Sequence, residues 1–142
     1  MDAHDRPAAA VVGLGYVGLP MAVALAKAGY RVFGLDIDGE KINRLNAGRS
    51  TVIGIDDETI RSVRDRFTAG SDYAAISRAD AVVICVPTPL TPEREPDLAY
   101  IRSAVAAMLP HLKRGTLIAL ESTTYPGTTD ELIRRAVEEA RG

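Results

Sequence analysis

The chain has 142 residues, of which 46% are hydrophobic and 25% charged, and its 17 basic and 19 acidic side chains leave a net charge of -2 at pH 7. This length and composition are typical of one globular domain with a buried core, so we expect a single domain over residues 1–142. No Lys- or Arg-rich run stands out, which disfavours a nucleic-acid surface and an anionic-membrane surface. One cysteine excludes an internal disulfide, and two histidines far apart in the sequence argue against a zinc cluster. We therefore expect no metal site and a reducing, cytoplasmic setting.

The first predicted elements come from residues 8–26, which carry no charge, as a signal peptide or a membrane helix would. However, the preceding residues, MDAHDRP, include two acids and one base, and three glycines and a proline interrupt the apolar run. Neither feature is typical of a signal peptide, and no second apolar span follows. We instead predict a strand over 8–12, a turn beginning at Gly13, and a helix over 16–28 that ends at Gly29.

The middle of the chain predicts a second strand and three helices. The strand covers 30–36, and the helix after it is capped by Asp38 and stopped by Gly48. The stretch from 49 to 70 is the least regular, with a short helix over 58–66. Another short helix follows within "SDYAAISRAD", with Ser71 as its cap.

The last third of the chain continues the alternation of strands and helices. We predict a strand over 81–86, a proline-rich loop, a helix from its cap at Asp97 to Met108, and a strand over 115–121. A final helix over 128–140 begins with Thr128 and Glu131 spaced as a capping box. Because strands and helices alternate throughout, we predict a doubly wound α/β fold, a parallel sheet with helices on both faces.

A glycine-rich turn joins the first strand to the first helix. Its residues read G-x-G-x-x-G in the strand-to-helix context that gives this pattern its meaning, and they are Gly13, Leu14, Gly15, Tyr16, Val17 and Gly18. The first glycine allows the tight turn, the second allows a pyrophosphate to approach the backbone, and the third allows close helix packing. Exposed N–H groups and the helix dipole then attract the phosphates. The alternative is a glycine-rich turn that holds no ligand.

Asp36 ends the second strand, 18 residues after Gly18. This is close to the spacing expected of the acid that accepts hydrogen bonds from the adenosine ribose, and a carboxylate there repels a 2′-phosphate. The sequence therefore predicts NAD rather than NADP. The alternative is that Asp36 only helps to cap the next helix beside Asp38. Lys41, one helical turn further on, either contacts the ribose and offsets this acidity or lies on a solvated helix face.

Two later segments follow predicted strands, at the edge where ligands bind in open α/β sheets. In "CVPTP", Thr88 could face the cofactor, although a purely structural turn is the alternative. Cys85 lies in an apolar strand, so we expect a buried, unreactive thiol. "ESTTYPGTT", over 121–129, places three consecutive Ser or Thr residues and a Pro-Gly turn at the next strand end, which indicates a polar wall near the nicotinamide.

Together these segments resemble the N-terminal, Rossmann-type NAD-binding domain of the UDP-glucose/GDP-mannose dehydrogenase family. From Val11 to Thr129, the segments that carry the resemblance are VVGLGYVGLPMAVALA, LDIDGEKINRLNAG, ADAVVICVPTP, PDLAYI and LESTTYPGTT. The last is most similar to the branch acting on UDP-N-acetylhexosamines, the UDP-N-acetylglucosamine 6-dehydrogenases.

The resemblance implies an NAD-dependent, four-electron oxidation of a sugar-nucleotide C6 alcohol to a carboxylate. By position, residues 13–18 bind the pyrophosphate, and Asp36 and Lys41 contact the adenosine ribose. The groove beside the cofactor is lined by Val86, Pro87 and Thr88. Ser122 contacts the nicotinamide half, and Thr123 acts catalytically by orienting a water or the substrate oxygen.

Members of this family also have a dimerising helix and a C-terminal domain that binds the nucleotide sugar and supplies the nucleophilic cysteine. Cys85 is not that cysteine, because a thiol within the cofactor loop has no access to the sugar. The resemblance therefore implies that this chain binds NAD without catalysing the reaction, and that the full-length protein is a homodimer or larger, serving surface polysaccharide synthesis. The alternatives are a free-standing NAD-binding regulatory module, or a dehydrogenase of the 3-hydroxyacid or 6-phosphogluconate type, against which "CVPTP" and "ESTTYPGTT" count.

Overall fold

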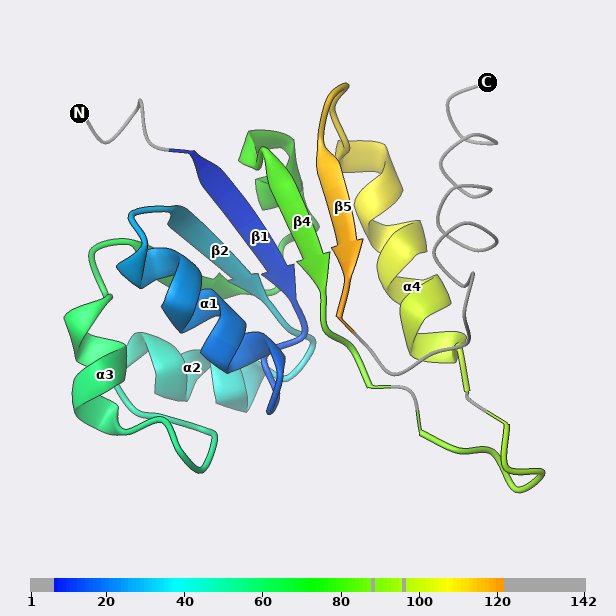
Figure 1. Ribbon diagram of the computed structural model, residues 1–142, viewed down its shortest axis with the longest axis horizontal. Helices are drawn as coiled ribbons and strands as arrows, with labels where there is room; N and C mark the ends of the chain where they lie inside the picture. The colour runs from blue at the N-terminus through cyan, green and yellow to red at the C-terminus, as the bar shows by residue number, and fades with distance from the viewer. Residues whose placement is uncertain (1–6, 88, 96, 122–142) are drawn as a thin grey trace.

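The computed structural model describes residues 7–87, 89–95 and 97–121 (Figure 1). These residues form one five-stranded sheet in the order β3-β2-β1-β4-β5, in which every pair of neighbours is parallel. The strands are β1 (Ala8–Val12), β2 (Arg31–Leu35), β3 (Phe67–Gly70), β4 (Ala81–Ile84) and β5 (Leu117–Leu120). The predicted doubly wound α/β fold is confirmed.

Helices cover both faces of this sheet, as the continuous apolar run of the central strand requires. All five residues of β1 are buried, the pattern of a strand packed on both sides. One face packs against α1 (Gly18–Lys27), α2 (Gly39–Asn46) and α3 (Asp57–Ser62). The other packs against the 3-10 helix η2 (Tyr73–Arg78), α4 (Ala99–Met108) and η3 (Leu109–His111).

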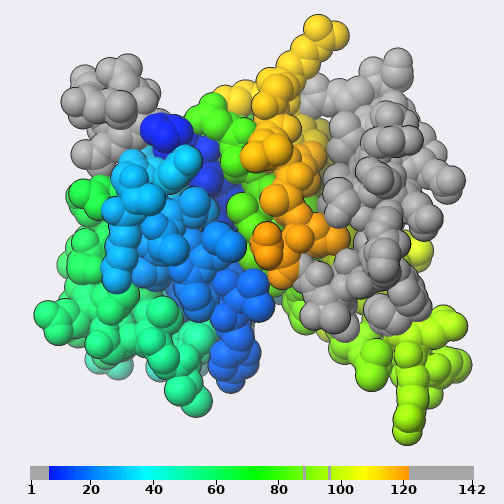
Figure 2. All heavy atoms as spheres, in the orientation of Figure 1, coloured from blue at the N-terminus to red at the C-terminus, as the bar shows by residue number. Residues whose placement is uncertain are grey.

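The outermost strand on one side, β5, is less buried than the centre of the sheet. Leu117 is 67% exposed, and the other three residues of the strand are partly buried. Figure 2 shows its side chains (orange) at the surface beside α1 (blue). Among the described residues, no helix has the length and apolar character needed to cross a membrane.

The predicted cap of α2 is confirmed, and the predicted caps of η2 and α4 are corrected. The Asp38 carboxylate accepts hydrogen bonds from the backbone N–H groups of Glu40 and Lys41, at 3.1 and 3.2 Å, and so caps α2. The predicted Ser71 cap is wrong. Asp72 lies directly before the first residue of η2 and accepts a hydrogen bond from the Ala74 N–H at 2.9 Å. The N-cap residue of α4 is Leu98, and Asp97, one residue earlier, accepts from the Ala99 N–H at 2.9 Å.

Two predicted helices are too long, and one strand was missed. The first helix begins at Gly18 rather than residue 16, because residues 13–17 are occupied by the turn. The helix predicted over 58–66 is the shorter α3, and the chain then forms β3 beside β2. Only Phe67 of this four-residue strand is buried, and the strand is defined by its pairing with β2. The helix predicted over 128–140 lies outside the described residues.

Candidate functional site

The glycine-rich turn is held tightly on its inner side. The Gly13 N–H donates to the Leu35 carbonyl at 2.8 Å, and Gly13 has φ +95°, a conformation that glycine adopts without strain. A Cβ atom on Gly13 would lie 2.8 Å from the Cys85 carbonyl oxygen, and one on Gly18 would overlap the Gly13 carbonyl oxygen. Both glycines therefore allow β1, β4 and α1 to approach one another closely.

The outer side of the same turn is open. No atom lies within 4 Å of the position that a Cβ on Gly15 would take. The backbone N–H groups of Gly15, Tyr16 and Val17 donate no hydrogen bond to any acceptor in the described part of the chain. The first bond of α1 runs from the Leu19 N–H to the Gly15 carbonyl, at 3.0 Å, so these N–H groups lie at the positive end of the helix. A pyrophosphate fits such a surface.

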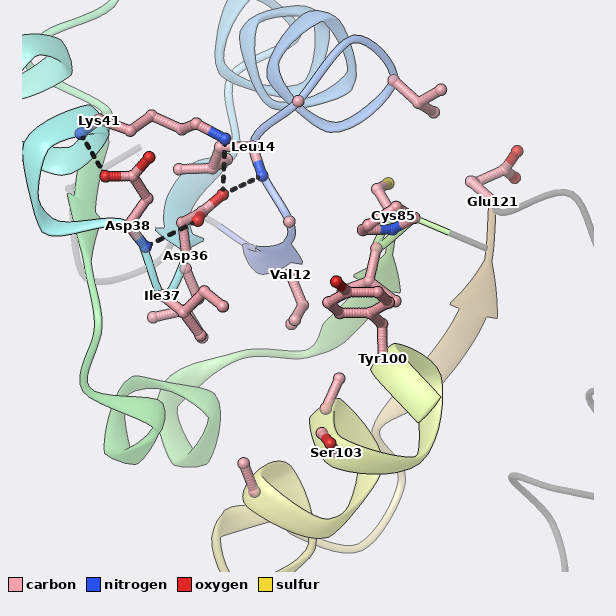
Figure 3. A pocket seen from close by; sticks show the side chains of 18 of the residues that line it. Val12, Leu14, Asp36, Ile37, Asp38, Lys41, Cys85, Tyr100, Ser103 and Glu121 are labelled. Atoms are coloured by element: carbon pink, nitrogen blue, oxygen red, sulfur yellow. Dashed lines mark hydrogen bonds and ion pairs between the residues drawn. The ribbon is translucent and has the colours of Figure 1, made fainter. Parts of the chain in front are cut away.

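Asp36 connects this turn to helix α2 (Figure 3). Its Oδ2 accepts from the Leu14 N–H at 2.9 Å and lies 3.4 Å from the Lys41 ammonium, while its Oδ1 accepts from the Asp38 N–H at 3.0 Å. The side chain is only 10% exposed. Burial acts to raise the pKa of Asp36, but the two backbone hydrogen bonds and the Lys41 charge outweigh it, so the pKa lies below its ordinary value.

The alternative that Asp36 merely caps α2 is therefore too narrow. Asp38 occupies the cap position, and Asp36 holds the turn in place from the end of β2. A carboxylate accepts at about four lone-pair positions, and three donors already contact Asp36. Room remains for a ribose hydroxyl, so the ribose contact stays a prediction.

A cavity of about 780 Å³ brings most of the predicted site together at the carboxyl edge of the sheet. It lies at the ends of the neighbouring strands β1 and β4. Between these two strands the order in the sheet reverses direction, and open α/β sheets bind ligands at such a switch point. The predicted residues that line it are Gly13, Leu14, Gly15, Tyr16, Val17, Asp36, Lys41, Val86 and Pro87. Gly18 packs beneath the turn instead, and Thr88, Ser122 and Thr123 lie outside the described residues.

Cys85 lies at the end of β4, where its N–H donates to the Val12 carbonyl at 2.7 Å. Burial, and then the negative charge of Glu121, raise the pKa of the Cys85 thiol to about 11. The thiol is therefore neutral at physiological pH, and the expectation of a buried, unreactive cysteine is confirmed. Across the described residues, no group of three or more His, Cys, Asp or Glu side chains is placed to hold a metal ion.

Sequence reasoning missed the side chains that line the far part of this cavity. They come from the segment after Asp36, from η2, from α4 and from the end of β5, and they include Ile37, Tyr73, Tyr100, Ser103 and Glu121. Burial, and then the charge of Asp36, raise the pKa of Tyr73 above its ordinary value, which places these two groups within electrostatic reach. The available signal was the spacing of Tyr100, Ser103 and Ala107, which puts them on one side of the helix that follows β4.

Comparison with known proteins identifies the family. Residues 8–142 match the model of the UDP-glucose/GDP-mannose dehydrogenase family, NAD binding domain. The chain belongs to this family. Its cofactor is NAD, and the open glycine turn beside an acidic residue fits that dinucleotide.

Named relatives of the chain act on nucleotide sugars. An NDP-N-acetyl-D-galactosaminuronic acid dehydrogenase of Ralstonia nicotianae is 42% identical over 124 residues, which cover 86% of this chain and 29% of the relative. A UDP-N-acetyl-D-mannosamine dehydrogenase of Escherichia coli is 37% identical over the same shares of each chain. The structure of a UDP-glucose dehydrogenase from Pyrobaculum islandicum matches with a TM-score of 0.89 and 34% identity, covering 98% of this chain and 34% of that one. The chain thus spans about a third or less of the length of these relatives.

Proposed function

We propose that this chain is the cofactor half of an NAD-dependent nucleotide-sugar 6-dehydrogenase acting on a UDP-N-acetylhexosamine. The observation that carries the proposal is the open turn with three unbonded N–H groups, joined through Leu14 to the Asp36 carboxylate at the mouth of one cavity. Oxidation of the C6 alcohol to a carboxylate removes four electrons, which requires two NAD molecules in turn. Two of the relatives are named for N-acetylated hexoses, which favours that substrate class.

The roles of the site residues follow from the chemistry around the cavity. The pyrophosphate binds the N–H groups of residues 15–17, because they are unbonded and lie at the start of α1. The adenosine ribose binds Asp36, with Lys41 beside it. The other half of the cofactor extends past Val86, Pro87 and Thr88 toward the end of β5, where Ser122 contacts the nicotinamide and Thr123 is the catalytic residue that orients a water or the substrate oxygen.

The remaining parts of the proposal concern the whole protein. The UDP-sugar binds through a C-terminal domain, the full-length protein assembles as a homodimer or larger through a central helix, and the enzyme works in the cytoplasm in polysaccharide synthesis. The 142-residue chain is the single cofactor domain, so it binds NAD and produces no NADH from UDP-sugars. Sequencing the gene past the codon for Gly142 tests this directly, since a stop codon there would favour a free-standing NAD-binding module.

Titration calorimetry of the 142-residue chain with NAD and NADP tests the cofactor site. We expect heat with NAD and at least tenfold weaker binding of NADP, because the Asp36 carboxylate repels a 2′-phosphate. Absence of heat with NAD, or equal affinity for both dinucleotides, would contradict the assignment. For the substrate class, NADH release by the full-length protein is compared between UDP-N-acetylhexosamines and UDP-glucose. Faster turnover of UDP-glucose would reject the N-acetylhexosamine assignment.

A further inference from the structure

The charged side chains that line the cavity lie at two separate ends of it. Asp36, Asp38 and Lys41 lie together where β2 is followed by α2, whereas Glu121 follows β5 and lies across the cavity from them (Figure 3). The first three are engaged with their surroundings, since Asp36 lies 3.4 Å from the Lys41 ammonium and Asp38 caps α2. The Glu121 carboxylate forms no hydrogen bond or ion pair among the residues that the structure describes. It therefore supplies an uncompensated negative charge to its end of the cavity.

The sheet fixes the position of Glu121. Its backbone N–H donates to the Ile84 carbonyl at 2.9 Å, which extends the parallel pairing of β4 and β5 by one residue. Cys85 and Val86 continue the chain from β4 and line the same end of the cavity. The negative charge of Glu121 contributes to the raised pKa of the Cys85 thiol, so the carboxylate lies within electrostatic reach of this end.

In the arrangement of the proposed function, the nicotinamide is the part of the cofactor that reaches this end. The adenosine ribose lies at Asp36, and the pyrophosphate lies at the N–H groups of residues 15–17. The remaining half of NAD then extends past Val86 and Pro87 toward the end of β5, where Glu121 lies. A role for Glu121 toward the nicotinamide thus rests on the proposed function.

The charge of the nicotinamide ring distinguishes the two redox forms of the cofactor. The ring is a cation in oxidised NAD and is neutral in NADH, while the rest of the molecule is the same. A carboxylate beside the ring attracts the oxidised form through its charge and gains nothing comparable from the reduced form. Because Glu121 is exposed, water and salt screen this attraction, and the expected discrimination is severalfold rather than many orders of magnitude.

We propose that Glu121 gives this site a preference for oxidised NAD over NADH. Its carboxylate lies beside the nicotinamide ring and strengthens the binding of the cationic form. The proposed oxidation uses two NAD molecules in turn, so NADH leaves the site and oxidised NAD enters it between the two steps. A preference for the oxidised form favours this exchange. Glu121 thereby affects which redox form the site holds, a property separate from the choice between NAD and NADP at Asp36.

Titration calorimetry of the 142-residue chain with oxidised NAD, NADH and ADP-ribose tests the proposal. ADP-ribose lacks the nicotinamide, so it reports the effect of a charge change on the phosphates alone. We expect Glu121→Gln to weaken oxidised NAD about threefold and to leave NADH and ADP-ribose within about 1.5-fold of the unmodified chain. In Glu121→Lys, the preference for oxidised NAD over NADH should fall about tenfold. Glu58→Gln is the matched control, because it removes the same charge from an exposed residue of α3 that does not line the cavity.

Added salt provides a second measurement, because it screens exposed charges. The preference of the unmodified chain for oxidised NAD should decrease as salt is added, whereas that of Glu121→Gln should change less. Melting temperatures establish that each variant is folded. If the affinities of Glu121→Gln for all three ligands change by the same factor, or none of them changes, the inference is wrong. Failure of the unmodified chain to bind oxidised NAD would instead overturn the proposed function.

Discussion

The inner and outer sides of the glycine turn differ in what they contact, although both sides are formed by glycine residues. On the inner side, Gly13 lies against backbone atoms of Cys85 and Val86, which follow β4, and Gly18 lies against backbone atoms of Gly13. On the outer side, Gly15 has no atom within 4 Å of an added Cβ. The comparison indicates that the inner glycines serve folding and the outer glycine serves ligand access, so substitution by alanine should separate the two effects.

The largest expected effect is that of Gly18→Ala on stability. The new methyl group would overlap the Gly13 carbonyl oxygen, and backbone cannot move aside as a flexible side chain would. We expect a loss of about 3 kcal/mol in the free energy of unfolding, or roughly 10 °C in melting temperature. Thermal unfolding followed by circular dichroism measures it.

Gly39→Ala is the matched control for this substitution. Gly18 and Gly39 are the first residues of α1 and α2, but an added Cβ on Gly39 meets nothing within 4 Å. We expect the melting temperature of Gly39→Ala to be equal to or slightly above that of the unmodified chain, because alanine favours helix. Equal melting temperatures for the two variants would show that the inner side of the turn is not close-packed.

Gly15→Ala should reverse the pattern, with a large effect on binding and a small one on stability. Its methyl group has free space in the absence of ligand, so we expect a melting temperature within about 2 °C of the unmodified chain. The same methyl group occupies the approach to the N–H groups of the turn, so NAD affinity should fall at least tenfold. Calorimetry and melting on one preparation test both halves, and unchanged NAD affinity would reject the outer side as the pyrophosphate site.

Asp36 contributes both to stability and to ligand binding, because it accepts a hydrogen bond from the turn and also lines the cavity. Asp36→Ala should cost about 1–2 kcal/mol of stability through the lost bonds from Leu14 and Asp38. It should also weaken NAD about tenfold and bring NADP closer to NAD, since Lys41 is then free to meet a 2′-phosphate. In Asp36→Ala/Lys41→Met, the gain toward NADP should disappear. If affinity for both dinucleotides is unchanged in Asp36→Ala, the carboxylate is only a structural connector.

The part of the site that could be predicted from the sequence is the part formed by residues close together along the chain. The strand, turn and helix around Gly13 and the acid at Asp36 follow from spacing that any such dinucleotide turn must have. The difference between Gly15 and Gly18 depends on which atoms β4 and the turn bring nearby, which no local pattern encodes. Tyr100 and Ser103 were missed because the position of α4 beside the cavity follows from the order of the strands in the sheet, which the local sequence does not show. The edge strand β3 was missed for the same reason, since only its pairing with β2 defines it.

The smallest expected effect is the pH dependence of the bond between Asp36 and the turn. The pKa of Asp36 is lowered from 3.8 in the folded chain, so its ionised form is stabilised by folding. This contribution is fully present above pH 3.8 and is lost as the pH falls through the folded-state pKa. Asp36→Asn has no charge to lose at this position and retains the other acids, so their titrations cancel in the comparison. The melting-temperature difference between the unmodified chain and Asp36→Asn should therefore be constant from pH 7 to about 5 and shrink below pH 3.8. A difference that stays constant below that pH would mean that the Leu14 N–H bond does not depend on the carboxylate charge, and that Asp36 serves the inner side of the turn through its shape alone.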